Sequence, residues 1–451
     1  MTESSGLKSD ERARLLSRLA GRRPAAAAPA ALAKPRLPLG RDDVHRDIEL
    51  VKRAGAALDI ANPFFRPHDG TAGATTSIGG RRFENFVSYN YLGLNGDPRV
   101  NAAAKDAIDR YGTSVSASRI VSGERPIHRA LERVLADVYR ADDALVLVSG
   151  HATNVTVIGD LVGRDDLVIH DSLAHNSIVQ GALASCAQRI AFPHNDLDEL
   201  DRLLGHARAK AVRALVVVEG HYSMDGDAPD LRALVAIVRA HGAYLMVDEA
   251  HSLGVLGARG LGIFESCGVD PREIDLWMGT LSKTLSGCGG YVAGSAELID
   301  YLRHSAPGFV YSVGLPPPVA AAALASMEIM LAEPERVARL QANGQAFLAA
   351  AHACGLDTGR SIGAAVVPVM TGSSIVAARA AALLFARGIN VQPIIYPAVP
   401  EQGARLRFFL SSLHEPAVLE RVVNEVADVM AHVRGQPVDY AALAGRIAAG
   451  G

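Results

Sequence analysis

The residue with the clearest chemical potential is a lysine that follows a short apolar run. Lys283 stands in WMGTLSKTLSGCGG, where a buried-looking strand leads into small residues and glycines. A lone lysine is usually a solvated surface charge. A lysine in a partly desolvated pocket, however, loses its proton more easily and can form a Schiff base with a carbonyl group. The small neighbours of Lys283 would leave room for a flat cofactor.

A carboxylate and a histidine follow another apolar run, 35 residues before that lysine. In AYLMVDEAHSLG, Asp248 ends the run and His251 comes three residues later. Ligand sites of α/β proteins form at the carboxyl ends of strands. An aspartate there could keep a pyridine nitrogen protonated, which makes the ring an electron sink. His251 could hydrogen-bond a phenolic oxygen of the same ring. The structural alternative for Asp248 is a capping role.

The letters DEAH also spell a helicase box, which needs a phosphate loop of the form GxxxxGK[ST] elsewhere in the chain. GTLSKT lacks the glycine before its lysine, and no other stretch supplies the loop. The formal net charge of −3 gives no electrostatic reason to expect nucleic acid or an anionic membrane surface. We therefore predict that the chain has no nucleic-acid partner.

Two other strand ends carry weaker signals. Gly150 and His151 begin a helical stretch directly after the run in LVLVSGHATN. Backbone N–H groups at a helix start, with a glycine to let the ligand approach, can cradle a phosphate. His175 follows the run in LVIHDSLAHNSI. Most single histidines are surface or satisfied core residues, but a flat imidazole at this edge could stack on a cofactor ring.

These residues need a sheet to bring them together, and the chain beyond about residue 97 has the pattern of one. Short apolar runs alternate with stretches of helical spacing. The runs are ALVLVS (144–149), LVIH (167–170), ALVVVE (214–219), AYLMVD (243–248), DLWMG (275–279) and GYVAG (290–294). Strands that alternate with helices predict a mostly parallel sheet covered on both faces.

Composition suggests the domain boundaries and excludes several classes of protein. We expect a flexible tail and linker at 1–40, an N-terminal segment at 41–96, a large cofactor-binding domain at 97–330 and a smaller α/β domain at 331–451. Hydrophobic residues make up 49% of the 451 residues, which is globular composition. The four cysteines form no CxxC pair, so we expect neither a disulfide framework nor a metal site.

The expected cellular location rests on two sequence features, the apolar runs and the opening residues. No apolar run reaches the roughly 18 residues that a membrane-spanning helix needs. The opening residues, MTESSGLKSDERARLL, lack the basic-then-apolar pattern of a signal peptide. We therefore expect a cytoplasmic protein without a membrane span.

Longer motifs resemble those of the α-oxoamine synthases, a family of fold-type-I enzymes that use pyridoxal phosphate (PLP). The resemblance covers roughly residues 60–435. It rests on VSYNYLGLNGDPRV, YGTSVSASRIVSGERPIHRALE, VSGHATN, HDSLAHNSI, VEGHYSMDGDAPDL, VDEAHSLGVLGARGLG, GTLSKTLSGCGGYVAG, YSVGLPPP, GINVQPIIYPAVP and RLRFFLSSLHEP. It implies an α/β fold with a large, mostly parallel sheet domain and a smaller C-terminal domain, assembled as a homodimer with active sites at the subunit interface.

The resemblance also implies a role for each candidate residue. Lys283 would hold PLP as an internal aldimine and act as the base, Asp248 would pair with the pyridinium, and His175 would stack on the ring and hydrogen-bond the reacting acyl group. The other implied cofactor contacts are His251 and Ser223 at the phenolic oxygen, Gly150, His151 and Thr280 at the phosphate, and Ser312 at the phosphate of the neighbouring subunit.

Two residues would grip the carboxylate of the amino acid, Asn90 in YNYLGL and Arg407 in RLRFFL. An arginine fork matches a carboxylate in two places, which fixes its orientation. Arg405 is the structural alternative, which we expect on the opposite face of the strand. Arg66 is a candidate for the acyl entrance. Ala398 stands where the family usually has a threonine that touches the acyl substrate, which puts that contact in doubt.

The implied reaction is a decarboxylative Claisen condensation of glycine, alanine or serine with an acyl thioester, giving an α-amino ketone, CO2 and a free thiol. The alternatives are an aminotransferase on the same fold and a regulatory subunit, which would lack the lysine. The donor would be acyl-CoA or an acyl-carrier protein. A basic amphipathic segment at 11–23 is either a frayed tail or a helix that docks an acidic carrier protein.

Overall fold

The computed structural model describes residues 40–436, 441 and 445–446, in two compact units. One unit comprises Met1–Asp59 with Tyr440–Gly451, and of it the structure describes mainly helix α2 (Asp42–Ala57). The other, Ile60–Asp439, holds all the sheets. The predicted amphipathic segment at 11–23 lies outside the described residues. None of the described helices is long and apolar enough to cross a membrane.

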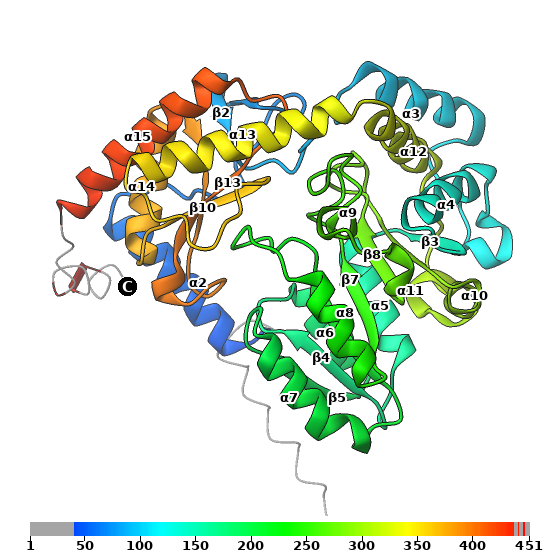
Figure 1. The fold of residues 1–451 in the computed structure, drawn as a ribbon. Helices are drawn as coiled ribbons and strands as arrows, with labels where there is room; N and C mark the ends of the chain where they lie inside the picture. The colour runs from blue at the N-terminus through cyan, green and yellow to red at the C-terminus, as the bar shows by residue number, and fades with distance from the viewer. Residues whose placement is uncertain (1–39, 437–440, 442–444, 447–451) are drawn as a thin grey trace, which may run out of the picture. The chain divides into compact units, whose positions relative to one another are not determined.

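A seven-stranded sheet forms the centre of the larger unit (Figure 1), in the order β3-β9-β8-β7-β6-β4-β5. Its strands are β3 (Asp143–Leu147), β4 (Leu167–Asp171), β5 (Gln188–Phe192), β6 (Ala214–Glu219), β7 (Tyr244–Asp248), β8 (Leu276–Thr280) and β9 (Gly290–Gly294). Only β9 runs against its neighbours. The predicted mostly parallel sheet is therefore confirmed, and each of the six predicted runs contains a strand.

The seventh strand, β5, was not predicted from the sequence. It lies at the edge of the sheet, and only Phe192 among its residues is fully buried. The apolar run that marks a central strand comes from burial on both faces. An edge strand with mostly exposed residues lacks that run, so the pattern does not reveal it.

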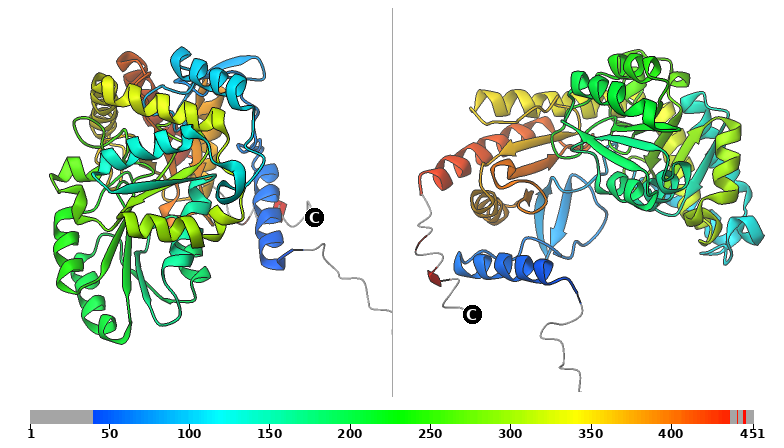
Figure 2. Two further views of the ribbon diagram at one scale, coloured as in Figure 1. Left: turned by 90° about the vertical axis from the view of Figure 1, so that its right-hand side faces the viewer. Right: turned by 90° about the horizontal axis from the view of Figure 1, so that it is seen from below.

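Helices cover both faces of this sheet (Figures 1 and 2). Alternate residues of each strand enter different cores, as Val168 does on one side and Ile169 on the other. The helices on the Val168 side are α5 (Gly150–Leu161), α6 (Asn176–Ala184), α10 (Ala296–Ser305) and α11 (Pro307–Val310). The other core takes α4 (Pro126–Tyr139), α7 (Leu197–Ala207), α8 (Leu231–Ala240), α9 (Ile263–Cys267) and α12 (Pro317–Ala332). Helix α3 (Pro98–Tyr111) packs on α12.

Two three-stranded sheets complete the unit. Strand β13 (Arg405–Phe409) lies between β10 (Val366–Met370) and β12 (Gln392–Ile394), antiparallel to both. The second sheet joins the hairpin β1 (Thr75–Ile78) and β2 (Arg81–Asn85) to β11 (Ile389–Asn390). The remaining helices are α13 (Pro334–Ala353), α14 (Ser374–Ala386) and α15 (Pro416–Arg434). Because this pairing joins distant parts of the chain, the boundaries at 96 and 330 stay a prediction.

Candidate active site

The carboxyl ends of the parallel strands bring the predicted residues into one cavity of about 270 Å³. Strands β3, β4, β6, β7 and β8 run in the same direction, so the residues that follow them meet at one edge. The cavity is lined by Ser149, Gly150, His151, Asn154, His175, Ser177, Glu219, Asp248, Ala250, His251, Met278, Thr280, Ser282 and Lys283. Most of the predicted cofactor residues are among them.

Lys283 lies on the turn after β8 and is partly buried. Burial lowers the pKa of its amine to about 8, although Asp248 and Glu219 oppose that shift, and the positive charge of Arg407 adds to it. An amine with this pKa is partly unprotonated near neutral pH. It can therefore act as a nucleophile toward a carbonyl group or as a base.

Asp248 is held in one orientation by two donors. Its Oδ1 accepts the N–H of Ala250 at 2.9 Å, and its Oδ2 accepts Nδ2 of Asn154 at 2.8 Å. Asn154 also donates to Ser177 Oγ at 3.0 Å. Asp248 caps no helix, since the next one begins at Ile263; its only local backbone contact is the turn N–H of Ala250. We did not predict Asn154, which is buried on helix α5 among several other polar residues.

His251 is buried against a tyrosine of the YNYLGL motif. Its Nδ1 lies 2.7 Å from the hydroxyl of Tyr91. Burial lowers the pKa of His251 well below its usual value and raises that of Tyr91 well above 10, so both groups are neutral. We assign the hydrogen bond as Tyr91 donating to Nδ1, which places the proton of His251 on Nε2. That N–H is then available to an acceptor in the cavity.

His175 caps helix α6 and is anchored from three directions. Its Nδ1 lies 2.6 Å from Ser177 Oγ, and its backbone N–H donates to Oε1 of Glu219 at 2.6 Å. The ring meets that of His151 edge-on, with centroids 6.2 Å apart. Burial lowers the pKa of His175 and, with the charge of Asp248, raises that of Glu219 to about 8. Sequence reasoning missed Glu219, which ends a buried run as Asp248 does.

The start of helix α5 lies too close to β8 for any side chain between them. A Cβ placed on Gly150 would stand 2.8 Å from Oγ1 of Thr280. Ser149 caps the helix by accepting the N–H of Ala152. The free N–H groups of this twelve-residue helix therefore open into the cavity, where the helix dipole favours an anion.

The two arginines of β13 differ in what they contact. Arg405 forms an ion pair with Asp225 at 2.9 Å and donates to the carbonyl of Met224. Arg407 forms no ion pair within the described part of the chain; its Nη1 donates to Ser223 O at 3.2 Å, and its buried Nε has no hydrogen-bond partner. Burial lowers the pKa of Arg407. The expectation that the two lie on opposite faces was wrong, because residues two apart in a strand share a face.

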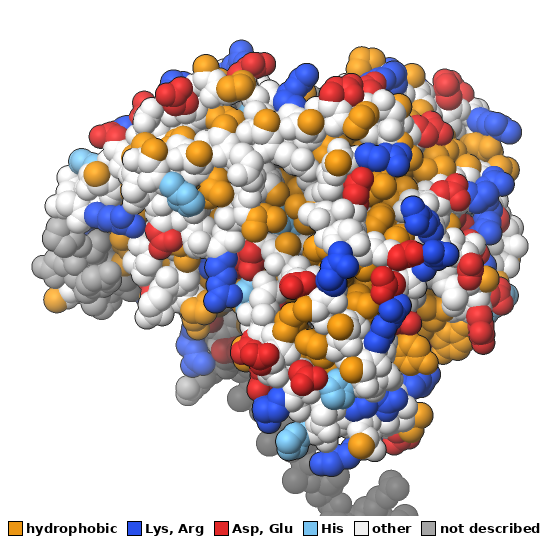
Figure 3. All heavy atoms as spheres, in the orientation of Figure 1, with side chains coloured by type: hydrophobic (Ala, Val, Ile, Leu, Met, Phe, Trp, Pro, Cys, Tyr) orange, Lys and Arg blue, Asp and Glu red, His pale blue; other side chains and the backbone are white. Residues whose placement is uncertain are grey.

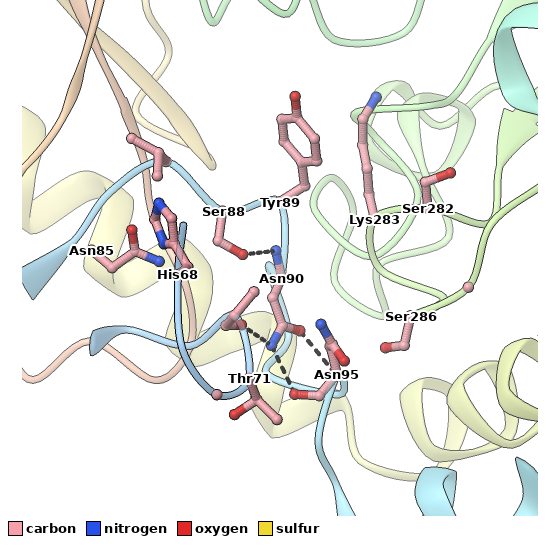
Figure 4. A pocket seen from close by; sticks show the side chains of 14 residues that line it. His68, Thr71, Asn85, Ser88, Tyr89, Asn90, Asn95, Ser282, Lys283 and Ser286 are labelled. Carbon is pink, nitrogen blue, oxygen red and sulfur yellow. Dashed lines mark hydrogen bonds between the residues drawn. The ribbon is translucent and has the colours of Figure 1, made fainter. Parts of the chain in front are cut away.

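A second cavity of about 370 Å³ adjoins the first, since Ser282 and Lys283 line both. Figure 4 shows its side chains, with Tyr89 beside Lys283. Asn90 lines it, but its Nδ2 donates to the carbonyls of Ala72 (2.8 Å) and Asn95 (3.2 Å). Both amide hydrogens are therefore used within the loop. The role predicted for Asn90 requires these hydrogen bonds to open.

The remaining predicted residues, and Arg407 with them, line neither cavity. Ser223 contributes its carbonyl oxygen to Arg407, with no side-chain contact to the cavity. Ser312 lies on a partly exposed segment. Arg66 places its guanidinium 3.6 Å from the ring centroid of Phe385, a cation–π contact. Ala398 is exposed.

Comparison with known proteins gives a consistent result. The family model for aminotransferase class I and II matches residues 81–426. The chain is 44% identical to an 8-amino-7-oxononanoate synthase of Anaeromyxobacter sp. (strain K), over 79% of this chain and 89% of the relative. It is 43% identical to the enzyme of that name from Geobacter sulfurreducens, over 80% and 92%.

Solved structures show the same likeness. Serine palmitoyltransferase from S. paucimobilis, with a bound PLP–myriocin aldimine, is 31% identical with a TM-score of 0.82, covering 87% of this chain and 100% of that one. An 8-amino-7-oxononanoate synthase from Francisella tularensis shares the fold, with a TM-score of 0.67 at 24% identity over 77% of this chain and 97% of that one.

The electrostatics of Lys283 can be tested without any ligand. In the apo-protein, we expect acetylation of Lys283 to show a pH midpoint near 8. Glu219→Gln should move that midpoint lower, because it removes a carboxylate that raises the pKa of the amine. Peptide mass spectrometry measures the modification, with the exposed Lys105 in the same digest as an internal control. An unchanged or higher midpoint in the variant would contradict this account.

Proposed function

The chain belongs to the α-oxoamine synthases within the aminotransferase class I and II family, and we propose that it condenses a small amino acid with an acyl thioester. The products are an α-amino ketone, CO2 and the free thiol. One observation carries the proposal. Lys283, whose pKa burial lowers to about 8, shares a cavity with Asp248. The charge of Arg407, which has no carboxylate partner among the described residues, also acts on this lysine.

The residues of the 270 Å³ cavity fit PLP as the cofactor. When bound, PLP supplies a ring that takes up the electron pair left at the Cα atom of the amino acid. Lys283 is the residue that would attach to it, and Asp248 would accept a hydrogen bond from the ring nitrogen. Gly150 fits the phosphate, because only a glycine leaves the helix N–H groups open beside Thr280.

Two other cavity residues and Arg407 would orient the reacting groups. The Nε2–H of His251 is placed to donate to the phenolic oxygen, and the ring of His175 to lie against the cofactor. Arg407 would bind the amino-acid carboxylate, since its Nε is free and its charge is already desolvated. Lys283, as a free amine, would take the proton from Cα and later return one there.

The choice among glycine, alanine and serine stays open, because selection by one methyl or hydroxymethyl group is worth only about 1–3 kcal/mol. An aminotransferase would share Lys283 and Asp248, but the relatives named above are synthases. A regulatory subunit would not need the lysine. A cytoplasmic location is our proposal, supported by four cysteines that form no disulfide.

A thiol-release assay tests the reaction. We expect equimolar thiol and CO2 from the PLP-loaded protein with one of the three amino acids, and neither from Lys283→Ala. Arg407→Lys should raise the amino-acid KM roughly 10- to 100-fold, since a charged hydrogen bond is worth about 1.5–3 kcal/mol, without lowering the Tm. Arg405→Lys should instead lower the Tm, because it disturbs the pair with Asp225. Keto-acid formation without CO2 would point to an aminotransferase.

We propose a homodimer in which Ser312 reaches the phosphate of the neighbouring subunit. Ser312 stands between Tyr311 and Val313, which are 86% and 47% exposed. The adjoining loop adds Val121, 80% exposed, and hydrogen-bonds this segment through Ala117 O and the N–H of Gly314. Figure 3 shows hydrophobic side chains gathered over the side of the molecule that carries α3, α4, α10 and α11. Apolar surface of this extent supports burial against a second copy.

Sedimentation velocity measures the assembly. We expect the unmodified chain to sediment as a dimer, and Val121→Lys with Tyr311→Lys to shift it toward an inactive monomer. Val212→Lys, an exposed apolar residue just before β6 and away from that face, is the control. A fully active monomer would refute the shared active site.

We also propose an acyl-carrier protein as donor, with acyl-CoA as the alternative. The support is a sequence feature in residues outside the described structure, a basic segment ahead of an Ala- and Pro-rich linker. Its arginines are Arg12, Arg14, Arg18, Arg22 and Arg23. A chain starting at Leu39 should show a several-fold higher KM for the acyl-carrier protein and an unchanged KM for acyl-CoA. Equal kinetics with both donors before and after truncation would contradict the docking role.

A further inference from the structure

A histidine outside the cavity is held between two buried carboxylates. His194 lies just after β5; its Nδ1 is 2.9 Å from Asp171 Oδ1 and its Nε2 is 2.8 Å from Asp227 Oδ2. All three side chains are at least nine-tenths buried, and none lines either cavity. A ring that faces a carboxylate at each nitrogen donates from both, so His194 is an imidazolium.

The surroundings of His194 keep that charge in place. The two carboxylates outweigh the effect of burial and raise the pKa of His194 to about 9. The other groups against the ring are neutral. Asn195 donates its N–H to Asp171 Oδ2 and its Nδ2 to Asp227 Oδ2, and Tyr222 meets the imidazole edge-on, with its own pKa raised by burial. Without the proton, two buried carboxylates would share one donor from the ring.

One carboxylate shapes the turn that delivers His175. Asp171 is the last residue of β4. Its Oδ1 accepts the N–H of Leu173 at 2.7 Å, and its carbonyl accepts the N–H of Ala174 at 3.1 Å. The next residue, His175, begins helix α6. The position of the imidazole in the cavity therefore depends on where Asp171 is held.

The residue that carries the other carboxylate, Asp227, closes through its backbone carbonyl the loop on which both arginines of β13 rest. The carbonyl of Asp227 accepts the N–H of Tyr222 at 2.9 Å and lies 3.0 Å from Nδ1 of His221. Inside this loop, Ser223 O meets Arg407, while Met224 O and the Asp225 carboxylate meet Arg405. The position of Arg407 therefore depends on where Asp227 is held.

We propose that His194 is a positioning residue whose imidazolium ties these two turns together and so sets the distance between His175 and Arg407. It acts through Asp171 and Asp227, which hold the ring from opposite sides. The inference rests on the proposed function for its kinetic consequence only. A misplacement of about 1 Å in a catalytic arrangement can reduce the rate roughly 100-fold.

His194→Gln removes the charge and one of the two bonds. We expect its kcat to fall 10- to 100-fold and its amino-acid KM to rise. Its affinity for PLP, followed by cofactor absorbance, should change less than threefold, since Lys283 and Asp248 are untouched. The control is His241→Gln. His241 contacts a single exposed aspartate, Asp201. Because His241 precedes β7, it lies at the amino ends of the parallel strands, opposite the candidate site. Wild-type kcat and KM in His194→Gln would overturn the proposal.

Two measurements on the apo-protein do not depend on the reaction. The unfolded pKa of His194 is near 6.5, so the stability from its charge is complete below that pH and is lost as pH rises through about 9. The Tm should fall more steeply over this range in the wild type than in His194→Gln. Imidazole ¹⁵N resonances should show His194 titrating near pH 9, and at a lower pH in Asp227→Asn.

These measurements separate the possible failures. If His194→Gln does not fold, Asp227→Asn decides, because that variant keeps the histidine and one carboxylate. An unchanged titration of His194 in Asp227→Asn would overturn the proposal that His194 ties the two turns together. If the wild type releases no thiol, the proposed function fails. The titration and Tm profiles still test on their own whether His194 ties the two turns together.

Discussion

The site depends on one constraint. The amine of Lys283 is buried beside two carboxyl groups, at the carboxyl ends of the parallel strands. Desolvation favours the neutral form of Lys283, while Asp248 and Glu219 favour the charged form. The balance gives a pKa of about 8, within reach of neutral pH. The two carboxylates can stand so close only because β6 and β7 are parallel neighbours, with Glu219 paired to Asp248 in register.

Close packing of small residues creates the opposite wall of the cavity. A Cβ on Gly290 of β9 would stand 2.5 Å from Thr153 Oγ1 and 2.8 Å from the Cα of Gly150. The antiparallel strand β9 therefore allows the first turn of helix α5 to lie directly on the sheet. Glycines at both contact points, with Thr280 beside them, bring the helix N–H groups to the same edge as Lys283.

The two parts of the site come from distant chain segments, and polar contacts join them beside the shared apolar core. The loop 220–227 leaves the central sheet and receives both arginines of β13. Arg405 forms an ion pair with Asp225, whereas Arg407 forms no ion pair within the described residues. His194 holds the same loop from the side of the central sheet. A rate measured on this protein would therefore report on contacts well outside the cavity.

The sequence by itself determined six of the seven strands of the central sheet and the candidate residues at their ends. Buried strands show as apolar runs, and Lys283, Asp248, His251 and His175 follow them directly, so local pattern was sufficient. The tertiary structure decided the partners. Asn154 and Asp248 are 94 residues apart, and Tyr91 and His251 are 160 apart. It also showed that the amide of Asn90 is already bonded and that Ser223 contacts Arg407 through its carbonyl. Periodicity records only which face a residue takes, whereas a hydrogen bond between distant segments forms only after packing brings them together.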